Sequence, residues 1–289
     1  MSNSSSNGGA RGDGEMTSAL TKTVDWIPAV LHAQSLQGWD APVGFRAHLT
    51  RVANGMMTPE RLIYRSADEC GQASERLRPR PKRLLARLRS TPSAYEDPRY
   101  PVLRNHPDIH AAGPLRDFEG QASATRMLAF LGNLHHPQGT ISRLGKITSP
   151  DQIDVVHRYL FGDVYDWAGD LRTVRMSRGG FEFAKPEDIE GELQKATVSL
   201  VRHYSAEVDP ITGTDPEPLA DFLARYHWAH PFRDGNGRTA MTVLLALTGP
   251  TSLMRVSPDE WFAATTNSLG NVGKPDPGPW VPVVKRILW

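Results

Sequence analysis

The residues whose types and spacing could carry out chemistry lie mainly in one short segment, His230–Arg238, which reads HPFRDGNGR. Pro231 disfavours helical geometry at His230, so a preceding helix should end there and leave the imidazole free to point into a cleft. Gly235 and Gly237 let the backbone approach a ligand closely. A helix that starts within this segment would present unpaired N–H groups and the positive end of its dipole, which together form an anion site.

Other side chains of the segment extend this chemistry. Asp234 offers a hard oxygen ligand suited to Mg²⁺, which usually arrives with phosphates. Arg238 can fork onto phosphate oxygens, and Phe232 is expected to insert into the core and fix the loop. A base at His230, a metal ligand, an anion cradle and a cation are the parts that phosphoryl or nucleotidyl transfer requires. The alternative is a glycine turn between two helices, with a capping Asn236 and a buried histidine.

A second histidine, His227, lies three residues before His230, a spacing that also occurs in zinc sites. The sequence offers no matching acidic or cysteine ligand nearby, and a zinc site needs several such ligands. We therefore expect His227 to be structural or exposed, and we predict no zinc site.

The elements that must position this loop are predicted to be helices on both sides of it. Pro216–His227 carries an apolar stripe at helical spacing, and Thr239–Leu247 is strongly apolar and should form a buried helix. Leu171–Ala184 alternates around Gly179-Gly180, which instead predicts a β-hairpin. A hairpin is marginal by itself, so it must lie on the helices. The expected fold class is mainly α, a helical bundle with one β-hairpin.

Composition and charge narrow the class of protein. The chain has 289 residues and a formal net charge of +1, so its overall charge indicates neither nucleic acid nor membrane as a partner. No apolar run approaches the ~20 residues that a bilayer-spanning helix needs. Cys70 is the only cysteine, so an intramolecular disulfide is impossible, which fits a reducing cytosol.

Three regions are expected along the chain. Residues 1–15 lack the layout of a signal peptide and look like a disordered tail. Residues 16–97 hold weakly patterned helical segments without a chemical motif. They include a basic stretch, Arg76–Arg89, that is either a solvated linker or a contact for phosphate or an acidic partner. Residues 98–289, where the patterning improves, are predicted to form the catalytic domain.

The segment HPFRDGNGR resembles the core of the motif HPFx(D/E)GNGRxxR of the Fic (filamentation induced by cAMP) domain family. Its surroundings agree with that resemblance. His157–Gly169 is similar to the stretch that these proteins carry ahead of their hairpin, and Leu171–Pro186 resembles the flap that clamps the target segment. Tyr100–Glu119 is similar to the start of the Fic core, so the likeness runs from about Tyr100 to the C-terminus.

The resemblance implies a Fic fold that transfers AMP from ATP to a Ser, Thr or Tyr hydroxyl of a target protein. It implies His230 as the base for that hydroxyl and Asp234 as the Mg²⁺ ligand. The residues implied for binding the nucleotide are Phe232, Gly235, Asn236, Gly237 and Arg238. The hairpin would present the target in extended form by strand addition. The residues of this flap are Val174, Arg175, Met176, Ser177, Arg178, Gly179, Gly180 and Phe181.

The partners implied by the resemblance are proteins. The target should be a separate protein, such as a GTPase or a topoisomerase subunit. An antitoxin or inhibitor protein is a further partner that the resemblance allows for a toxin of this kind. The place of action would be the cytoplasm of a bacterium or, after export, a host cell.

One position departs from the family pattern. Met241 stands where the family has a second arginine, which helps to hold the γ-phosphate and pairs with an inhibitory glutamate in an (S/T)xxxE(G/N) helix. We expect weaker ATP binding or another donor, and absent or altered regulation by that glutamate. Glu119-Gly120 is the nearest match to the inhibitory helix, but Leu115 stands where serine or threonine is expected.

Two alternatives remain open at this point. The Doc branch of the family lacks the second arginine and acts as a kinase, but its loops carry a bulky basic residue in place of Gly237. Gly237 therefore favours nucleotidyl transfer over phosphorylation. The other alternative is a Fic-fold binding module with weak catalysis, in which the N-terminal hundred residues act. The intact His230 and Asp234 argue against that module.

Overall fold

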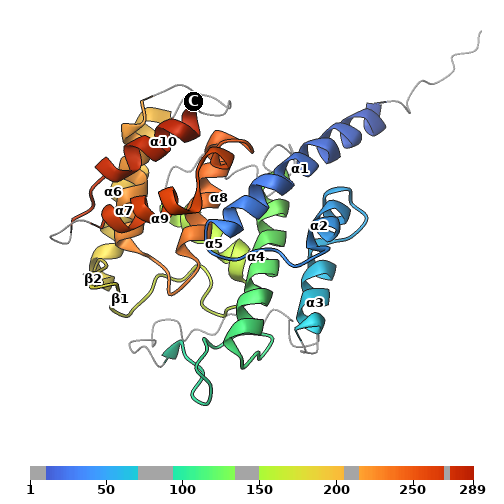
Figure 1. The fold of residues 1–289 in the computed structure, drawn as a ribbon, viewed down its shortest axis with the longest axis horizontal. Coiled ribbons are helices and arrows are strands. Elements are labelled where there is room, and N and C mark those ends of the chain that lie inside the picture. Colours follow the sequence, from blue (N-terminus) through green and yellow to red (C-terminus); the bar gives the residue numbers. More distant parts are fainter. Residues whose placement is uncertain (1–10, 71–93, 134–149, 205–214, 270–273) are drawn as a thin grey trace, which may run out of the picture.

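The structure is a computed structural model that describes residues 11–70, 94–133, 150–204, 215–269 and 274–289. The predicted basic stretch at 76–89 lies outside the described residues. The helices are α1 (Arg11–Ser35), α2 (Phe45–Ala53), α3 (Pro59–Glu69), α4 (Ala112–Asn133), α5 (Pro150–Phe161), α6 (Ile189–Tyr204), α7 (Glu217–Ala229), α8 (Asn236–Thr248), α9 (Pro258–Asn267) and α10 (Val281–Leu288). The predicted fold class, mainly helical with one β-hairpin, is confirmed (Figure 1).

Helix α4 lies at the centre of this arrangement. It contacts α1, α2 and α3 on one side and α5 and α8 on the other, while α6 and α7 form a closely packed pair (Figure 1). Phe118 and Leu128 of α4 are fully buried, because both faces of the helix are covered. One continuous buried cluster reaches from Trp26 in α1 to Leu288 in α10, so the N-terminal helices share a core with the rest of the chain.

Local sequence signals explain where several helices begin. Thr58 accepts a hydrogen bond from the backbone N–H of Arg61 at the start of α3, and Pro59 occupies the first helical position. Ser257 and Glu260 form a reciprocal capping box at the start of α9. Helix α1 begins at Arg11, within the segment that the sequence suggests is a tail.

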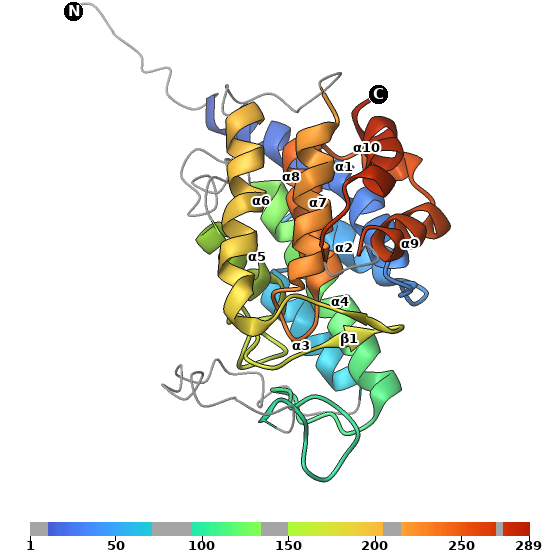
Figure 2. The ribbon, with the colours of Figure 1, turned by 90° about the vertical axis from the view of Figure 1, so that its left-hand side faces the viewer.

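The hairpin consists of β1 (Ser177–Arg178) and β2 (Phe181–Glu182), which pair antiparallel. Gly179 and Gly180 join the strands with φ values of 58° and 87°, as a tight two-residue hairpin turn requires. Figure 2 shows the hairpin lying across the ends of α6 and α7 that face the loop from His230 to Arg238. The regular pairing is shorter than the alternation of the sequence suggests, and other contacts hold the arms of the flap.

Candidate active site

The loop from His230 to Arg238 connects two buried helices. Helix α7 ends at Ala229, and His230 adopts the left-handed conformation with φ 44° and ψ 61°. Gly235 is also left-handed, with φ 78°, and α8 begins immediately after it. The first turn of α8 leaves its N–H groups without an intrahelical acceptor, so the predicted anion site has the backbone geometry that it needs.

The imidazole of His230 lies at the junction of the loop and the flap. Its ring stacks on Phe183, with centroids 3.9 Å apart and an interplanar angle of 11°. Its Nδ1 is buried and has no hydrogen-bond partner among the described residues. Burial and, to a smaller extent, the neighbouring His227, Arg172 and Arg178 lower the pKa of His230 to about 3. His230 is therefore neutral at physiological pH and able to accept a proton.

Phe232 and Asn236 fix the shape of the loop. Phe232 is fully buried, as predicted, and its ring stacks on His157 at 3.8 Å. The Asn236 amide donates to the carbonyl oxygen of Phe232 and its oxygen accepts from the Phe232 N–H, both at 2.9 Å. The Asn236 side chain thus braces the loop instead of capping the helix, which leaves its backbone N–H for an anion.

Asp234 carries a carboxylate that is exposed and lines the cavity above the loop. Its Oδ1 accepts a hydrogen bond of 2.6 Å from the N–H of Gly235, which orients the side chain. A carboxylate that faces an open cavity fits a Mg²⁺ ion, since this ion usually keeps several waters and binds through one or two carboxylates together with phosphates. Asp234 is the residue of the loop that could hold such an ion.

His157 in α5 supports the loop through hydrogen bonds, a role that the sequence does not reveal. The side chain is fully buried; its Nε2 donates to the carbonyl oxygen of Asp234 at 2.9 Å, and its Nδ1 accepts from the N–H of Gly169 at 2.8 Å. Burial lowers the pKa of His157 to about 3, so the ring stays neutral and keeps this pattern of donor and acceptor.

Arg172 joins the loop to the flap, and it too is missed by the sequence analysis. Its side chain is only 1% exposed. Its guanidinium donates to the carbonyl oxygens of Val174, Ala184, Ala229 and His230. Burial lowers the pKa of Arg172 to about 10, so it remains a cation at neutral pH. One buried cation therefore binds both arms of the flap and the end of α7.

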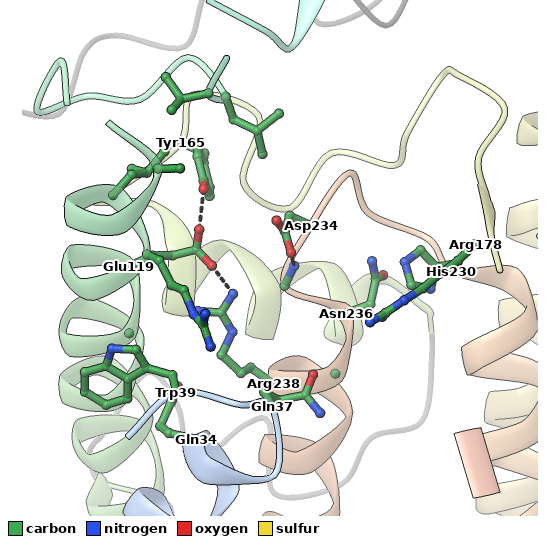
Figure 3. A pocket seen from close by; sticks show the side chains of 18 of the residues that line it. Gln34, Gln37, Trp39, Glu119, Tyr165, Arg178, His230, Asp234, Asn236 and Arg238 are labelled. Atoms are coloured by element: carbon green, nitrogen blue, oxygen red, sulfur yellow. Dashed lines mark hydrogen bonds and ion pairs between the residues drawn. The ribbon is translucent and has the colours of Figure 1, made fainter. Parts of the chain in front are cut away.

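Arg238 is directed toward α4. Its guanidinium forms an ion pair with Glu119 and a hydrogen bond of 3.2 Å to Ser123, and Glu119 also accepts from the hydroxyl of Tyr165 (Figure 3). Glu119 is only 7% exposed. Glu119, the nearest match in the sequence to the family's inhibitory glutamate, thus contacts Arg238, which the resemblance implies for binding phosphate. Met241, by contrast, is fully buried in the core.

Two cavities meet at His230. One of about 420 Å³ is polar and lies over the loop, between Asp234 and Glu119, and it is closed on one side by residues that follow α1. The other, of about 520 Å³, lies beneath the flap and reaches Trp261 and Phe262 of α9. The residues that line both are Gln37, Arg178, His230 and Gly237.

The flap residues occupy different environments. Val174 is buried in the core, so it anchors the flap instead of meeting a target. Met176 and Phe181 are half-buried, and Phe181 lines the cavity under the flap. The exposed residues are Arg175, Ser177, Arg178, Gly179 and Gly180.

His227 is structural. It is buried and stacks on Trp280 at 5.1 Å, with Trp261 at its edge. Among the described residues, the group of side chains arranged to hold a metal is Asp97, Asp108 and His110, none of which lines either cavity. In the part of the chain that the structure describes, no helix is both long and apolar enough to cross a lipid bilayer.

Comparison with known proteins relates the chain to one family. Residues 147–248, which include the loop and the flap, match the Fic/DOC family. The chain is 34% identical over 160 residues to a probable protein adenylyltransferase of Sinorhizobium fredii, an alignment that covers 54% of this chain and 77% of that protein. It is 33% identical over 93 residues to the protein adenylyltransferase VbhT of Bartonella schoenbuchensis, covering 31% of this chain and 18% of that one.

Solved structures agree on the fold. The chain is similar to the BepC effector protein of Bartonella tribocorum, whose structure contains bound AMPPNP, with a TM-score of 0.53 and 18% identity over 68% of this chain and 96% of that one. It is also similar to the Fic domain of the effector Bep8 from a Bartonella species, with a TM-score of 0.55 and 15% identity over 68% and 94% of the two chains.

Proposed function

The chain belongs to the Fic/DOC family, and we propose that it transfers AMP from ATP to a hydroxyl side chain of a target protein. The observation that carries this proposal is the meeting of a neutral His230, an exposed Asp234 and the N-terminus of α8 around one cavity. The similarity to a probable protein adenylyltransferase of Sinorhizobium fredii and to the protein adenylyltransferase VbhT of Bartonella schoenbuchensis supports the same reaction class.

In the proposed reaction, His230 accepts the proton of the target hydroxyl as its oxygen attacks the α-phosphorus of ATP. The bond from that phosphorus to the oxygen that bridges the β-phosphate breaks, and pyrophosphate leaves. The N–H groups at the start of α8 bind the charged phosphate oxygens through the transition state. Asp234 would hold Mg²⁺, which when bound would neutralise charge on the phosphates.

The rest of the nucleotide fits the cavity beneath the flap. That cavity begins at His230, where the α-phosphorus must lie, and its walls include the aromatic rings of Phe183, Trp261 and Phe262. An aromatic and partly polar cavity of this kind suits a nucleoside. Arg238 would bind phosphate only after its ion pair with Glu119 breaks.

The flap would present the target, which we place in the cytoplasm of a bacterium or of a host cell. Ser177 in β1 is exposed, and the next residue, Arg178, lines both cavities that meet at His230. An extended target segment could therefore add to this strand, with its hydroxyl side chain directed toward His230.

Labelled ATP tests the proposal. The protein and its variants His230→Ala and Asp234→Asn are incubated with a cell lysate, Mg²⁺ and ATP labelled on either the α- or the γ-phosphate. We expect protein label from α-labelled ATP only, lost with His230→Ala, because a general base contributes about 10²–10⁴-fold. Asp234→Asn should require a higher Mg²⁺ concentration. Label from γ-labelled ATP alone would instead show a kinase, and no transfer would favour a binding module.

A further inference from the structure

The arm of the flap that contains β1 has one face toward the site and one face toward solvent. Side chains alternate along an extended strand, so Met176 and Arg178 share one face and Arg175 lies on the other. Met176 packs against the core, and the N–H of Phe183 on the opposite arm donates to its carbonyl oxygen at 3.1 Å. The ring of Phe183 in turn stacks on His230. The face that carries Arg178 therefore covers the site.

Arg178 extends from this face to the place where the two cavities meet. It lines both of them, as His230 does, and Figure 3 shows its side chain alongside that of His230. Burial is the largest cause of the lowered pKa of His230, and the positive charge of Arg178 adds to it. The guanidinium is therefore close to the imidazole that is proposed to accept the proton of the target hydroxyl.

The arginines that line the cavity over the loop differ in what they bind. Arg238 pairs with Glu119, and Arg116 donates to the carbonyl oxygen of Gly38. Arg178, by contrast, has neither an ion pair nor a hydrogen bond with any residue that the structure describes. A guanidinium binds phosphate oxygens well because it is always charged and offers paired N–H donors. Arg178 is thus the arginine of this cavity that can bind an anion without first breaking another contact.

The position of Arg178 matches one phosphate of the nucleotide. The proposed reaction places the α-phosphorus beside His230, so a cation beside His230 is also beside that phosphorus. During an in-line displacement, charge lies on the phosphorus oxygens that are neither attacking nor leaving. The N–H groups at the start of α8 bind these oxygens from the loop, and Arg178 can bind one of them from the flap. Arg178 stays protonated throughout, and no bond to it forms or breaks.

We propose that Arg178 of the flap binds a non-bridging oxygen of the α-phosphate of the donor nucleotide and stabilises the charge on it during AMP transfer. This inference rests on the proposed function, which places the α-phosphorus at His230. The side chain of Arg178 then acts on the nucleotide, while the backbone of the same strand presents the target. The flap thus contacts both substrates of the reaction.

Nucleotide titrations on the full chain, without a target protein, test the phosphate contact. Binding of ATP, ADP, AMP and adenosine is measured by direct or displacement calorimetry for the wild type, Arg178→Gln and Arg178→Lys. We expect Arg178→Gln to bind ATP, ADP and AMP about tenfold more weakly, because a hydrogen bond between charged groups is lost, with adenosine binding unchanged. Arg178→Lys should be intermediate, since lysine keeps the charge without the planar fork. A loss confined to ATP and ADP would place the contact on another phosphate and overturn the proposal.

The rate of transfer gives a second readout. At saturating α-labelled ATP, Arg178→Gln should label protein about 100-fold more slowly, since a donor to the charged oxygen is missing in the transition state. Slower labelling with an unchanged affinity for AMP would indicate a contact of Arg178 with the target instead, which contradicts the proposal. A weaker affinity for adenosine as well would show that the substitution distorts the flap.

Arg175→Gln is the matched control for nucleotide binding. Arg175 lies on the same arm, is exposed, and lines neither cavity. The variant removes the same charge from the outward face, so its affinities for ATP, ADP and AMP should equal those of the wild type. Both glutamine variants should melt at the wild-type temperature, because neither arginine is buried. If the two variants weaken nucleotide binding equally, the effect is a general attraction by charge, and the contact with the α-phosphate does not exist.

The outcomes also separate this inference from the proposed function. Transfer of AMP by the wild type, with unchanged binding and transfer in Arg178→Gln, would leave the function standing and remove the role of Arg178. Binding of AMP that depends on Arg178, in a protein that transfers no nucleotide, would leave the phosphate contact and remove the function. A wild type that binds no nucleotide would overturn both.

Discussion

The loop from His230 to Arg238 and the flap meet at His230, yet they are held in different ways. The loop is fixed by buried side chains: Asn236 closes it on itself, His157 holds it from below, and Phe232 inserts into the core. The tip of the flap is exposed and has only a two-residue pairing on each strand. The part proposed to do the chemistry is therefore rigid, while the part proposed to meet the target keeps an accessible backbone.

Arg172 is the contact that the two regions share, and its replacement should have the largest effect. Arg172→Met would leave the carbonyl oxygens that now accept from the guanidinium without a buried donor. We expect the free energy of unfolding to fall by about 3 kcal/mol or more and AMP transfer to be lost. Urea unfolding and the labelling assay measure both. Arg172→Lys keeps the charge but cannot reach all of these acceptors, so an intermediate loss is expected; full stability in Arg172→Met would contradict the shared-anchor interpretation.

The next largest effect is expected in acid, because His157 beside the loop and His227 in α7 are buried and neutral, while the flap has no histidine. Burial lowers the pKa of His157 and of His227 from 6.5 to about 3. Below pH 6.5 the unfolded chain binds protons that the folded chain does not, so stability is complete above that pH and falls toward pH 3. The slope is ~1.4 kcal/mol per pH unit for each histidine.

Unfolding by urea at pH 7, 6, 5 and 4 measures this slope. His227→Phe is the matched variant, since it keeps a buried ring that stacks on Trp280 and removes one titrating group. It should flatten the slope by the contribution of one histidine. A stability that stays constant from pH 6.5 to 4 would show that these rings are not buried as described.

Glu119 tests whether Arg238 is available to phosphate. Glu119→Gln removes the charge that pairs with Arg238 and keeps a similar shape beside Tyr165. We expect ATP to bind about tenfold more tightly, because the arginine no longer exchanges one anion for another. Glu96→Gln is the control, since Glu96 pairs with Arg233 at the surface, at 3.4 Å. Equal ATP affinities for Glu119→Gln and the wild type would show that the ion pair does not compete with phosphate.

The smallest effect is expected at the tip of the flap. Ser177 pairs with Glu182 next to the closing pair of Arg178 and Phe181. By the alternation of an antiparallel pair, the N–H of Ser177 points away from β2, where a target strand could bind it. Ser177→Pro should raise the KM for the target about three- to tenfold through one lost hydrogen bond, with ATP binding unchanged.

Arg178→Pro is the comparison for this prediction. It removes the N–H of the closing pair of the hairpin, so it should disturb the turn itself. It should therefore affect both the target and the nucleotide, because Arg178 lines both cavities. If Ser177→Pro leaves the KM for the target unchanged, the target does not add to this edge of β1.

Local signals made the loop predictable from the sequence, whereas its supports depend on distant contacts. Pro231, Gly235 and the apolar helix after them indicate where the chain turns, because each acts on its own backbone. His157 and Arg172 act on carbonyl oxygens 77 and 58 residues away. A carbonyl has no sequence signature, so neither partnership could be predicted, although both residues lie in stretches that resemble the family.

The contribution of the N-terminal segment to the site is even harder to predict from the sequence. The sequence of residues 16–97 predicts helices without a chemical motif. Only the structure shows that Gln34 and Trp39 line the cavity over the loop. The sequence predicts that Met241 lies in a buried helix, but it does not predict whether the side chain faces the cavity or the core. The motif therefore predicts the reaction class better than it predicts how the phosphates are held.

The close approach of Trp39 to Gly120 has a consequence for the evolution of this protein. A Cβ at Gly120 would lie 2.3 Å from the indole, just as one at Gly237 would lie 1.9 Å from Gln37. Because the indole ring is rigid, Gly120 cannot be replaced while Trp39 is kept, whereas the flexible end of Gln37 could move away from a side chain at position 237. Across relatives, Gly120 and Trp39 should therefore co-vary, and sequences that have lost the aromatic residue should be free to acquire a side chain at the position of Gly120.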